Sequence, residues 1–177
     1  MNFIFTFSCF SPKEVKAINE LIKKNLNQKE DTTQSAKKIN KVGTFFNVPI
    51  SPIMHLIHPW LYSCQNINRE HFGYNVDWQF QTDGVNYNVY NINDTYGWHI
   101  DARTETCMDI KLTCLINLSE EPYEGGEFHV RGQEEGIIKF DSGMGIILHP
   151  LVAHKVTPVT KGKRITLTYW ARGPLWR

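Results

Sequence analysis

The sequence predicts an α+β fold in which N-terminal helices pack on one face of a double sheet. Two stretches with apolar residues at helical spacing lie within the first 71 residues, and from Asn75 onward the chain changes to short alternating runs. Asp-Gly, Asn-Asp, Gly-Gly and Ser-Gly pairs separate these runs and are typical of turns between strands. About eight short strands after two helices favour a jelly roll, which is a double-stranded β-helix of the cupin-like kind.

The first two elements are predicted to be a strand and a capped helix. Asn2–Cys9 is rich in Phe and Ile with Thr and Ser between them, which is a strand pattern. Ser11, Pro12 and Glu14 then form a helix start, with Ser as the N-cap, Pro at the first helical position and Glu at the third. Apolar residues at helical spacing extend the predicted helix over residues 12–27.

The polar segment over residues 28–41, which contains four lysines, is predicted to be a solvated loop. A lid over a binding site is the alternative for this loop. A second helix is expected over residues 52–68, where Pro59 could break it because a proline lacks the backbone N–H donor. We expect residues 1–177 to form one domain, with 1–71 supplying the first strand and supporting helices and 72–177 the jelly-roll core.

Composition argues against several classes of protein. Nineteen Lys and Arg against eighteen Asp and Glu leave a net charge of +1, which argues against nucleic acid or an anionic membrane as a partner. No apolar stretch approaches the length of a membrane span, and the N-terminus lacks the features of a signal peptide. The four cysteines form no CxxC pair, so we expect reduced thiols in a soluble, cytoplasmic protein. The oligomeric state cannot be inferred from these features.

The strongest chemical signal is the stretch Tyr96–Asp101, which contains a His-x-Asp pair. In an extended strand, His99 and Asp101 project to the same face because side chains alternate. The spacing alone is weak evidence, and an exposed edge strand with an incidental His and Asp is the alternative. An ionised carboxylate inside a strand is costly unless a cation compensates it, so the pair indicates two ligands of one metal ion.

A third ligand is expected from the C-terminal part of the chain, where His154 is the preferred candidate. It precedes the predicted strand Arg164–Trp170, whose odd-numbered residues are apolar and whose even-numbered residues are mostly polar. The even-numbered face directs Arg164 into the barrel, where a buried guanidinium needs an anion and its planar shape suits a carboxylate. His, Asp and His with open coordination positions form the facial triad of non-haem Fe(II) oxygenases.

Other histidines compete for the metal-binding role. His149 is an alternative third ligand, although a core position also fits it. His55 and His58 are spaced to lie on one helix face, but no acid or cysteine lies near them in the sequence. His129 alternates with a glutamate after Gly-Gly and is expected at the surface or behind the ligands. These three possibilities are less favoured than His154.

The residues singled out above lie within a longer series of segments that resemble those of a known protein family. From about Phe72 to the C-terminus the chain resembles the prolyl 4-hydroxylase-like branch of the Fe(II)- and 2-oxoglutarate-dependent dioxygenases, particularly the PKHD-type hydroxylases of bacteria and phages. The order and spacing of the segments agree with that family, and together they are far more specific than the His-x-Asp pair. The segments are Tyr90, Tyr96–Asp101, Asp109–Thr113, Leu118–Ser119, Tyr123–Phe128 and His154–Arg164.

The resemblance implies a metal, two cosubstrates and a reductant. Fe(II) would be held by His99, Asp101 and His154, with 2-oxoglutarate and O2 as cosubstrates and L-ascorbate keeping the iron reduced. Arg164 would pair with the distal carboxylate of 2-oxoglutarate, whose other end chelates the iron. These four residues are therefore the catalytic set that the family implies.

The resemblance also implies roles for hydroxyl and aromatic side chains. Tyr90 would help to hold the distal carboxylate through its hydroxyl, and Thr168 is a weaker candidate for the same task. Tyr96 and Trp170 match positions that shape the mouth where a target proline lies. Ordinary core positions remain the alternative for Tyr90 and Trp170.

The activity implied by the resemblance is hydroxylation of a prolyl residue in a peptide or protein, with release of succinate and CO2. The same oxygenase chemistry on a free amino acid, another small molecule or a nucleobase is the first alternative. A non-catalytic, metal-binding jelly roll is the second. A bacterial or phage origin fits the resemblance, whereas the substrate itself and the stereochemistry of hydroxylation cannot be predicted, because oxygenases that share one fold differ in their loops.

Overall fold

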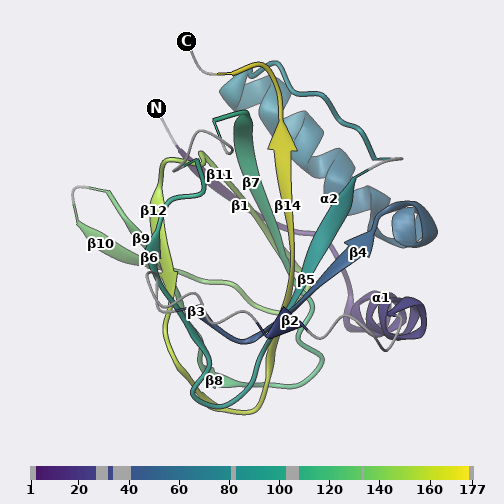
Figure 1. The fold of residues 1–177 in the computed structure, drawn as a ribbon, viewed down its shortest axis with the longest axis vertical. Coiled ribbons are helices and arrows are strands. Elements are labelled where there is room, and N and C mark those ends of the chain that lie inside the picture. Colours follow the sequence, from purple (N-terminus) through teal and green to yellow (C-terminus); the bar gives the residue numbers. More distant parts are fainter. Residues whose placement is uncertain are drawn as a thin grey trace.

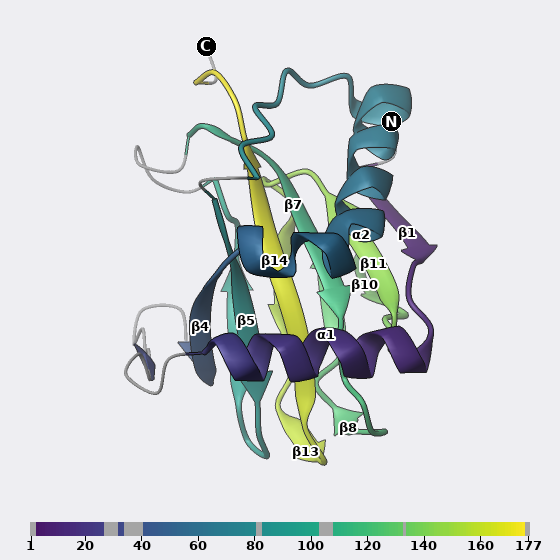
Figure 2. The ribbon, with the colours of Figure 1, turned by 90° about the vertical axis from the view of Figure 1, so that its right-hand side faces the viewer.

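The structure is a computed structural model that describes residues 3–26, 32–33, 41–80, 83–102, 108–132 and 134–175. Two antiparallel sheets face each other around the barrel interior, and the helices lie on the outside of the larger sheet (Figures 1 and 2). This arrangement is the predicted jelly roll. Within the described residues, no helix has both the length and the apolar character needed to cross a membrane.

The larger sheet has the strand order β1-β11-β7-β14-β5-β4-β2. Its long strand β14 pairs with β7 on one side and β5 on the other (Figure 2). The bounds of its strands are β1 Ile4–Ser8, β2 Thr32–Thr33, β4 Thr44–Pro49, β5 Gly84–Tyr90, β7 Ile110–Asn117, β11 Met144–Leu148 and β14 Arg164–Arg172. The predicted N-terminal strand is therefore present and pairs with β11 at the sheet edge.

The smaller sheet has the strand order β10-β9-β12-β6-β3, and a separate pair joins β13 to β8. The bounds are β3 Lys41–Val42, β6 Thr95–His99, β8 Glu124–Gly125, β9 Phe128–Arg131, β10 Glu135–Ile138, β12 Ala153–Val156 and β13 Val159–Lys161. Strand β12 lies between β9 and β6, so residues near positions 99 and 154 are neighbours in the sheet although far apart in the chain.

The first helix, α1 (Pro12–Asn25), begins as the sequence predicts. The Ser11 hydroxyl accepts a hydrogen bond from the backbone N–H of Glu14, and the Glu14 carboxylate accepts one from the backbone N–H of Ser11. This capping box satisfies backbone donors that have no partner inside the helix. Helix α1 buries one face against the larger sheet (Figure 2).

The second helix, α2 (Met54–Ile67), differs from the prediction in one respect. Pro59 lies inside it without ending it, so the suggested break is wrong. Short helical segments precede it at Ser51–Ile53 and follow it at Asn68–Phe72, and its buried face holds Trp60, Leu61 and Cys64 against the sheet. Packing of this apolar face outweighs the loss of one backbone hydrogen bond. The loop predicted over 28–41 lies outside the described residues except for positions 32, 33 and 41.

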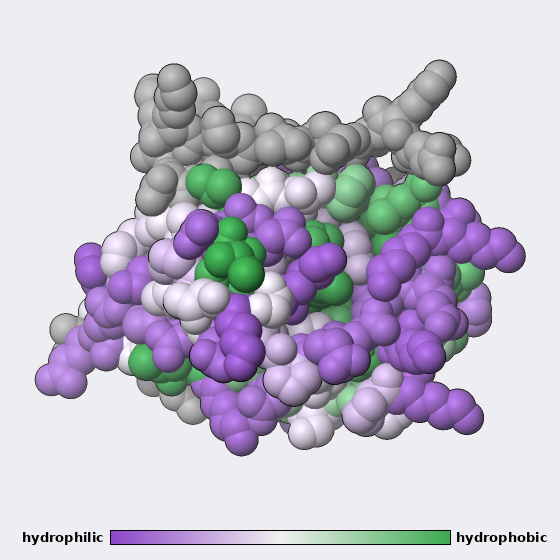
Figure 3. Space-filling view, turned by 90° about the horizontal axis from the view of Figure 1, so that it is seen from below, coloured by the Kyte–Doolittle hydropathy of each residue, from purple (hydrophilic) through white to green (hydrophobic). Residues whose placement is uncertain are grey.

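Apolar side chains form two main buried layers. One lies between the helices and the outer face of the larger sheet and includes Ile165, Leu167 and Tyr169 of β14. The other lies inside the barrel and includes Phe128 and Phe140. As predicted, the odd-numbered residues of β14 pack beneath the helices, while its even-numbered residues face the cavity inside the barrel. Hydrophilic side chains dominate the lower face of the molecule, with smaller apolar areas between them (Figure 3).

Candidate metal centre

The structure brings His99, Asp101 and His154 together on one wall of the barrel. His154 of β12 lies directly opposite His99 of β6 in the antiparallel register. The Nε2 atom of His99 lies 3.7 Å from Oδ1 of Asp101, and the Nε2 atom of His154 lies 3.8 Å from Oδ2 of the same carboxylate. The three side chains are nearly buried, and one ligand atom from each lies within 4.8 Å of the others.

Asp101 does not lie inside the strand as predicted, because β6 ends at His99 and the chain bends at Asp101. The backbone N–H of Asp101 donates to the carbonyl oxygen of Pro150 at 2.9 Å. The turn before β12 thus holds the backbone of Asp101 in the orientation that points its carboxylate toward the histidines. Strand alternation predicted the right direction for Asp101 but not the cause of that direction.

Backbone carbonyls orient both histidine rings. The Nδ1 atom of His99 lies 2.8 Å from the carbonyl oxygen of Gly97, and that of His154 lies 2.9 Å from the carbonyl oxygen of Val152. A carbonyl can only accept, so each Nδ1 carries the proton and donates. The lone pair of each Nε2 then faces Asp101, which is the tautomer that a metal-binding histidine needs.

The donor set fits a divalent metal. The Asp101 side chain is only 7% exposed, so its negative charge needs a nearby positive charge. A histidine that binds a metal is neutral, so His99 and His154 cannot supply that charge while they act as ligands. Two imidazoles and one carboxylate with open positions are the ligand set of non-haem Fe(II) sites. A metal ion would supply the missing positive charge. Within the described residues, this is the only group of three or more such side chains close enough to hold one ion.

A buried cation lies in the same cavity. Arg164 begins β14, is 1% exposed, and its Nε atom has no hydrogen-bond partner within the described residues. Its guanidinium carbon lies 5.3 Å from the ring centre of Tyr90 and 5.6 Å from that of Phe140. None of the carboxylates that the structure describes forms an ion pair with Arg164. A buried guanidinium without an anion indicates that the cavity accepts an anionic ligand.

Tyr90 lies opposite Arg164 in the pairing of β5 with β14. Its burial raises the pKa of its hydroxyl to about 12, although the nearby Arg164 charge partly offsets this effect. Tyr90 is thus a neutral hydroxyl group at physiological pH, able to donate a hydrogen bond to an anion beside Arg164. The structure places both side chains on the wall of one cavity, as the sequence predicts.

Two threonines and an asparagine continue this wall along β14 and β5. The Asn88 amide donates to the hydroxyl of Thr168 at 2.9 Å and to that of Thr166 at 3.3 Å. Sequence reasoning included Thr168 but missed Asn88. Its position two residues before Tyr90 in a strand is the signal that could have revealed it, because such residues share a face.

Aromatic side chains lie beside the candidate metal ligands. The ring of Tyr96 stacks on that of His99, with centres 3.6 Å apart and planes inclined by 7°. Trp170 lines the same cavity, and its indole N–H is buried without a hydrogen-bond partner within the described residues. Both predicted residues thus lie on the cavity wall, and Trp170 has a donor available for a ligand.

The other histidines lie apart from the three candidate ligands. His149 packs edge-on against Phe3 and Tyr74, and burial lowers the pKa of its imidazole. His129 lies between two glutamates, with 2.7 Å from its Nδ1 to Glu135 and 3.1 Å from its Nε2 to Glu127. On the helix, His58 stacks on an exposed tyrosine.

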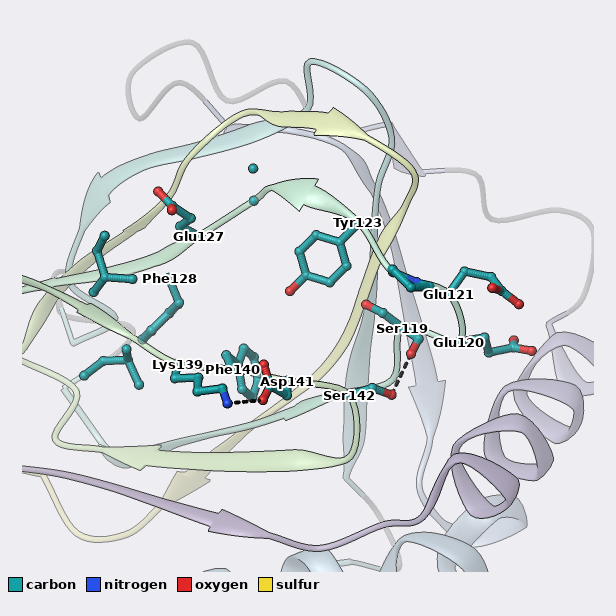
Figure 4. A pocket seen from close by; sticks show the side chains of 15 residues that line it. Ser119, Glu120, Glu121, Tyr123, Glu127, Phe128, Lys139, Phe140, Asp141 and Ser142 are labelled. Atoms are coloured by element: carbon teal, nitrogen blue, oxygen red, sulfur yellow. Dashed lines mark hydrogen bonds and ion pairs between the residues drawn. The ribbon is translucent and has the colours of Figure 1, made fainter.

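A wider hollow of about 490 Å³ lies around β8 and the connection from β10 to β11 (Figure 4). The Tyr123 hydroxyl points into it, and Lys139 and Asp141 form an ion pair at its edge. It contains none of the candidate ligands but shares Phe128 with their cavity. The chemistry described above therefore belongs to the smaller cavity inside the barrel.

Comparison with known families agrees with this geometry. Residues 85–172 match the family model described as the 2OG-Fe(II) oxygenase superfamily, and this span contains all three candidate ligands together with Arg164. The chain belongs to the 2OG-Fe(II) oxygenase superfamily. The predicted family is thereby confirmed for the part of this chain that contains the candidate metal centre.

Curated relatives match about half of this chain. A PKHD-type hydroxylase of Alteromonas mediterranea is 37% identical over 97 residues, and the PKHD-type hydroxylase YbiX of Escherichia coli is 36% identical over 94 residues. Each match covers 48% of this chain, with 41% of the first relative and 40% of the second. The chain thus matches less than half the length of these curated relatives.

Solved structures share the fold of nearly the whole chain. A prolyl-4-hydroxylase from Pseudomonas putida superposes with a TM-score of 0.76 at 15% identity, covering 98% of this chain and 94% of that one. A viral collagen prolyl hydroxylase from Paramecium Bursaria Chlorella virus-1, solved as a 2OG complex, gives 0.68 at 19% identity and covers 98% and 97%. This likeness confirms the jelly-roll fold of the oxygenase.

Proposed function

We propose that this oxygenase is an Fe(II)- and 2-oxoglutarate-dependent dioxygenase that hydroxylates a prolyl residue of a peptide or protein, with release of succinate and CO2. The principal support is the buried Arg164, which has no anionic partner within the described residues and lies in the same cavity as the His-Asp-His cluster. One cavity then has donors for a divalent metal and a separate cation for an acidic cosubstrate.

Each side chain has a defined task in this proposal. The Nε2 atoms of His99 and His154 and the carboxylate of Asp101 would hold Fe(II). Arg164 and the Tyr90 hydroxyl would bind the distal carboxylate of 2-oxoglutarate, because they lie side by side on adjacent strands. When bound, Fe(II) and 2-oxoglutarate supply the oxidising chemistry, and the protein orients them and keeps water away.

The remaining wall of the cavity would position the ligands. Thr168, whose hydroxyl oxygen accepts from the Asn88 amide, would donate its O–H to the cosubstrate carboxylate as a weaker contact. Tyr96 and Trp170 would contact the substrate, since both line the cavity and Tyr96 covers one face of His99. Proline is the proposed target because the similar solved structures include prolyl hydroxylases, one of them in complex with a peptide fragment.

We also propose cytoplasmic location and ascorbate as the reductant that keeps the iron reduced. Cys9, Cys64 and Cys114 are free thiols, which fits a reducing compartment. The net charge of +1 gives no general attraction to nucleic acid. The partner of the oxygenase in this proposal is therefore a peptide or protein substrate.

The test is succinate release from 2-oxoglutarate with Fe(II) and ascorbate, followed by mass spectrometry of a library of proline-containing peptides. We expect a mass increase of one oxygen on a prolyl peptide and its loss in Asp101→Asn. His58→Gln is the matched control, because His58 is an exposed histidine on α2. If succinate forms but free amino acids or nucleobases are hydroxylated in place of peptides, the proposed prolyl substrate is wrong and the alternative substrates apply. If the protein binds metal but forms no succinate under any condition, the proposed oxygenase activity is wrong and a non-catalytic metal-binding module is indicated.

A further inference from the structure

Thr113 lies across the cavity from the histidines, in the middle of β7 in the larger sheet. The histidines belong to β6 and β12 of the smaller sheet. Thr113 is 1% exposed and lines the metal cavity together with Asp101. A polar side chain so deeply buried must have a hydrogen-bond partner, which here is the candidate metal ligand itself.

The hydroxyl of Thr113 donates to Oδ2 of Asp101 at 2.5 Å. This distance is in the range of charge-assisted O–H···O⁻ bonds, which are stronger than bonds between neutral groups. Within the described residues, no other hydroxyl, amide or guanidinium group donates to the Asp101 carboxylate. The backbone N–H of Asp101 is bonded separately to Pro150. Asp101 is thus held by its backbone to the turn that joins β11 to β12 and by its side chain to β7 of the larger sheet.

The two attachments restrict how the carboxylate can present its oxygens. Rotation about the Cβ–Cγ bond would break the bond from Thr113, so the plane of the carboxylate is held in one orientation. A carboxylate that accepts a short hydrogen bond at one oxygen is directed to bind a metal through the other, whereas an unrestrained carboxylate can use both. One-oxygen binding occupies a single coordination position.

We propose that Thr113 is a positioning residue that holds Asp101 for metal ligation through one oxygen and so keeps coordination positions open for the cosubstrate. This inference rests on the proposed function, because it assumes that Asp101 binds the metal. Thr113 acts through Asp101 and is given no contact with the metal or the substrate. The backbone of β7 supplies the rigidity that this task requires, since it is paired on both sides with β11 and β14.

The experiment measures Co(II) binding to the metal-free full chain, which needs no turnover. Thr113→Val removes the hydroxyl at nearly constant volume, and Thr113→Ser retains it. We expect Thr113→Val to weaken Co(II) binding by about 10-fold to 100-fold and to change the visible Co(II) spectrum, which reports the coordination number. Thr113→Ser is expected to restore the wild-type spectrum and to bring the affinity to within about threefold of wild type.

The matched control is Thr95→Val, because the Thr95 hydroxyl donates to a backbone carbonyl, that of Val156, at 2.8 Å. This variant is expected to leave the Co(II) spectrum unchanged. Asp101→Asn separates the two levels of the proposal. Loss of Co(II) binding in Asp101→Asn, with wild-type affinity and spectrum in Thr113→Val, would overturn the role of Thr113 alone. Wild-type binding in both variants would overturn the metal site and with it the proposed function.

Discussion

Replacing Arg164 by methionine tests the most consequential feature of the cavity. The guanidinium is 1% exposed, has no anionic partner within the described residues, and lies beside Tyr90 on the cavity wall. Methionine preserves most of the volume of the side chain and removes its charge. The substitution should therefore have opposite effects on cosubstrate binding and on the stability of the cosubstrate-free protein.

The magnitude follows from the burial of the pair that Arg164 would form. Truncating one partner of a buried, hydrogen-bonded charge pair costs about 2–5 kcal/mol of binding free energy, which weakens 2-oxoglutarate binding by about 30-fold to several thousand-fold. Without ligand, a buried polar group that lacks a partner costs about 1–3 kcal/mol of folding free energy. Arg164→Met should therefore raise the melting temperature of the cosubstrate-free protein by at least about 2 °C.

Isothermal titration of 2-oxoglutarate into the Mn(II)-loaded protein, together with thermal unfolding with and without 2-oxoglutarate, measures both effects. Lys163→Met is the matched control, because Lys163 is the exposed cationic neighbour of Arg164 and should leave both quantities unchanged. A variant Arg164→Met that binds 2-oxoglutarate like the wild type would refute the cosubstrate role. A fall in the melting temperature of the cosubstrate-free protein would refute the claim that the buried guanidinium lacks an anionic partner.

Three further predictions concern single side chains. Tyr90→Phe should raise the Kd for 2-oxoglutarate by about 2-fold to 15-fold, which corresponds to the loss of one hydrogen bond. The pH profile of binding between pH 6 and 9 should not change, because the pKa of Tyr90 is about 12. Titration of 2-oxoglutarate at several pH values measures both effects. Ser11→Ala should lower the free energy of unfolding by about 1 kcal/mol in urea titrations, since it removes the N-cap of α1. Burial lowers the pKa of His149, so the folded state disfavours its protonation and stability falls as the pH drops below the ordinary value of 6.5. His149→Gln should therefore lose less stability than the wild type between pH 7.5 and 5.5 in urea titrations, and an equal loss would contradict this reasoning.

Features whose partners are close in sequence could be predicted without the structure. The capping box of α1 joins residues three positions apart, so its residue types alone indicate where the helix begins. The two faces of β14 follow from strict alternation, and that alternation placed Arg164 inside the barrel. The His-x-Asp spacing indicated two of the three candidate ligands, whereas His154 was chosen for its place before the predicted strand Arg164–Trp170.

Other features depended on contacts between distant segments. Polar Lys111, Thr113 and Asn117 alternate with apolar residues along β7, which indicates that Thr113 lies on the face opposite the helix-packed one but not that it contacts Asp101. The bend that directs Asp101 requires a carbonyl in the loop before β12, and the continuity of α2 through Pro59 depends on packing against the sheet. Periodicity reports which face of an element is apolar, but not which distant element covers it.

The fold class, the three candidate ligands and the inward direction of Arg164 could therefore be predicted from residue spacing, residue chemistry and the resemblance to a known family. The packed sheets were needed to show that Arg164 lacks an anionic partner within the described residues and that Thr113 donates to the buried carboxylate of Asp101. Both facts arise where the two sheets of the jelly roll face each other. A contact across that cavity depends on how both sheets pack, which no single segment of the chain specifies.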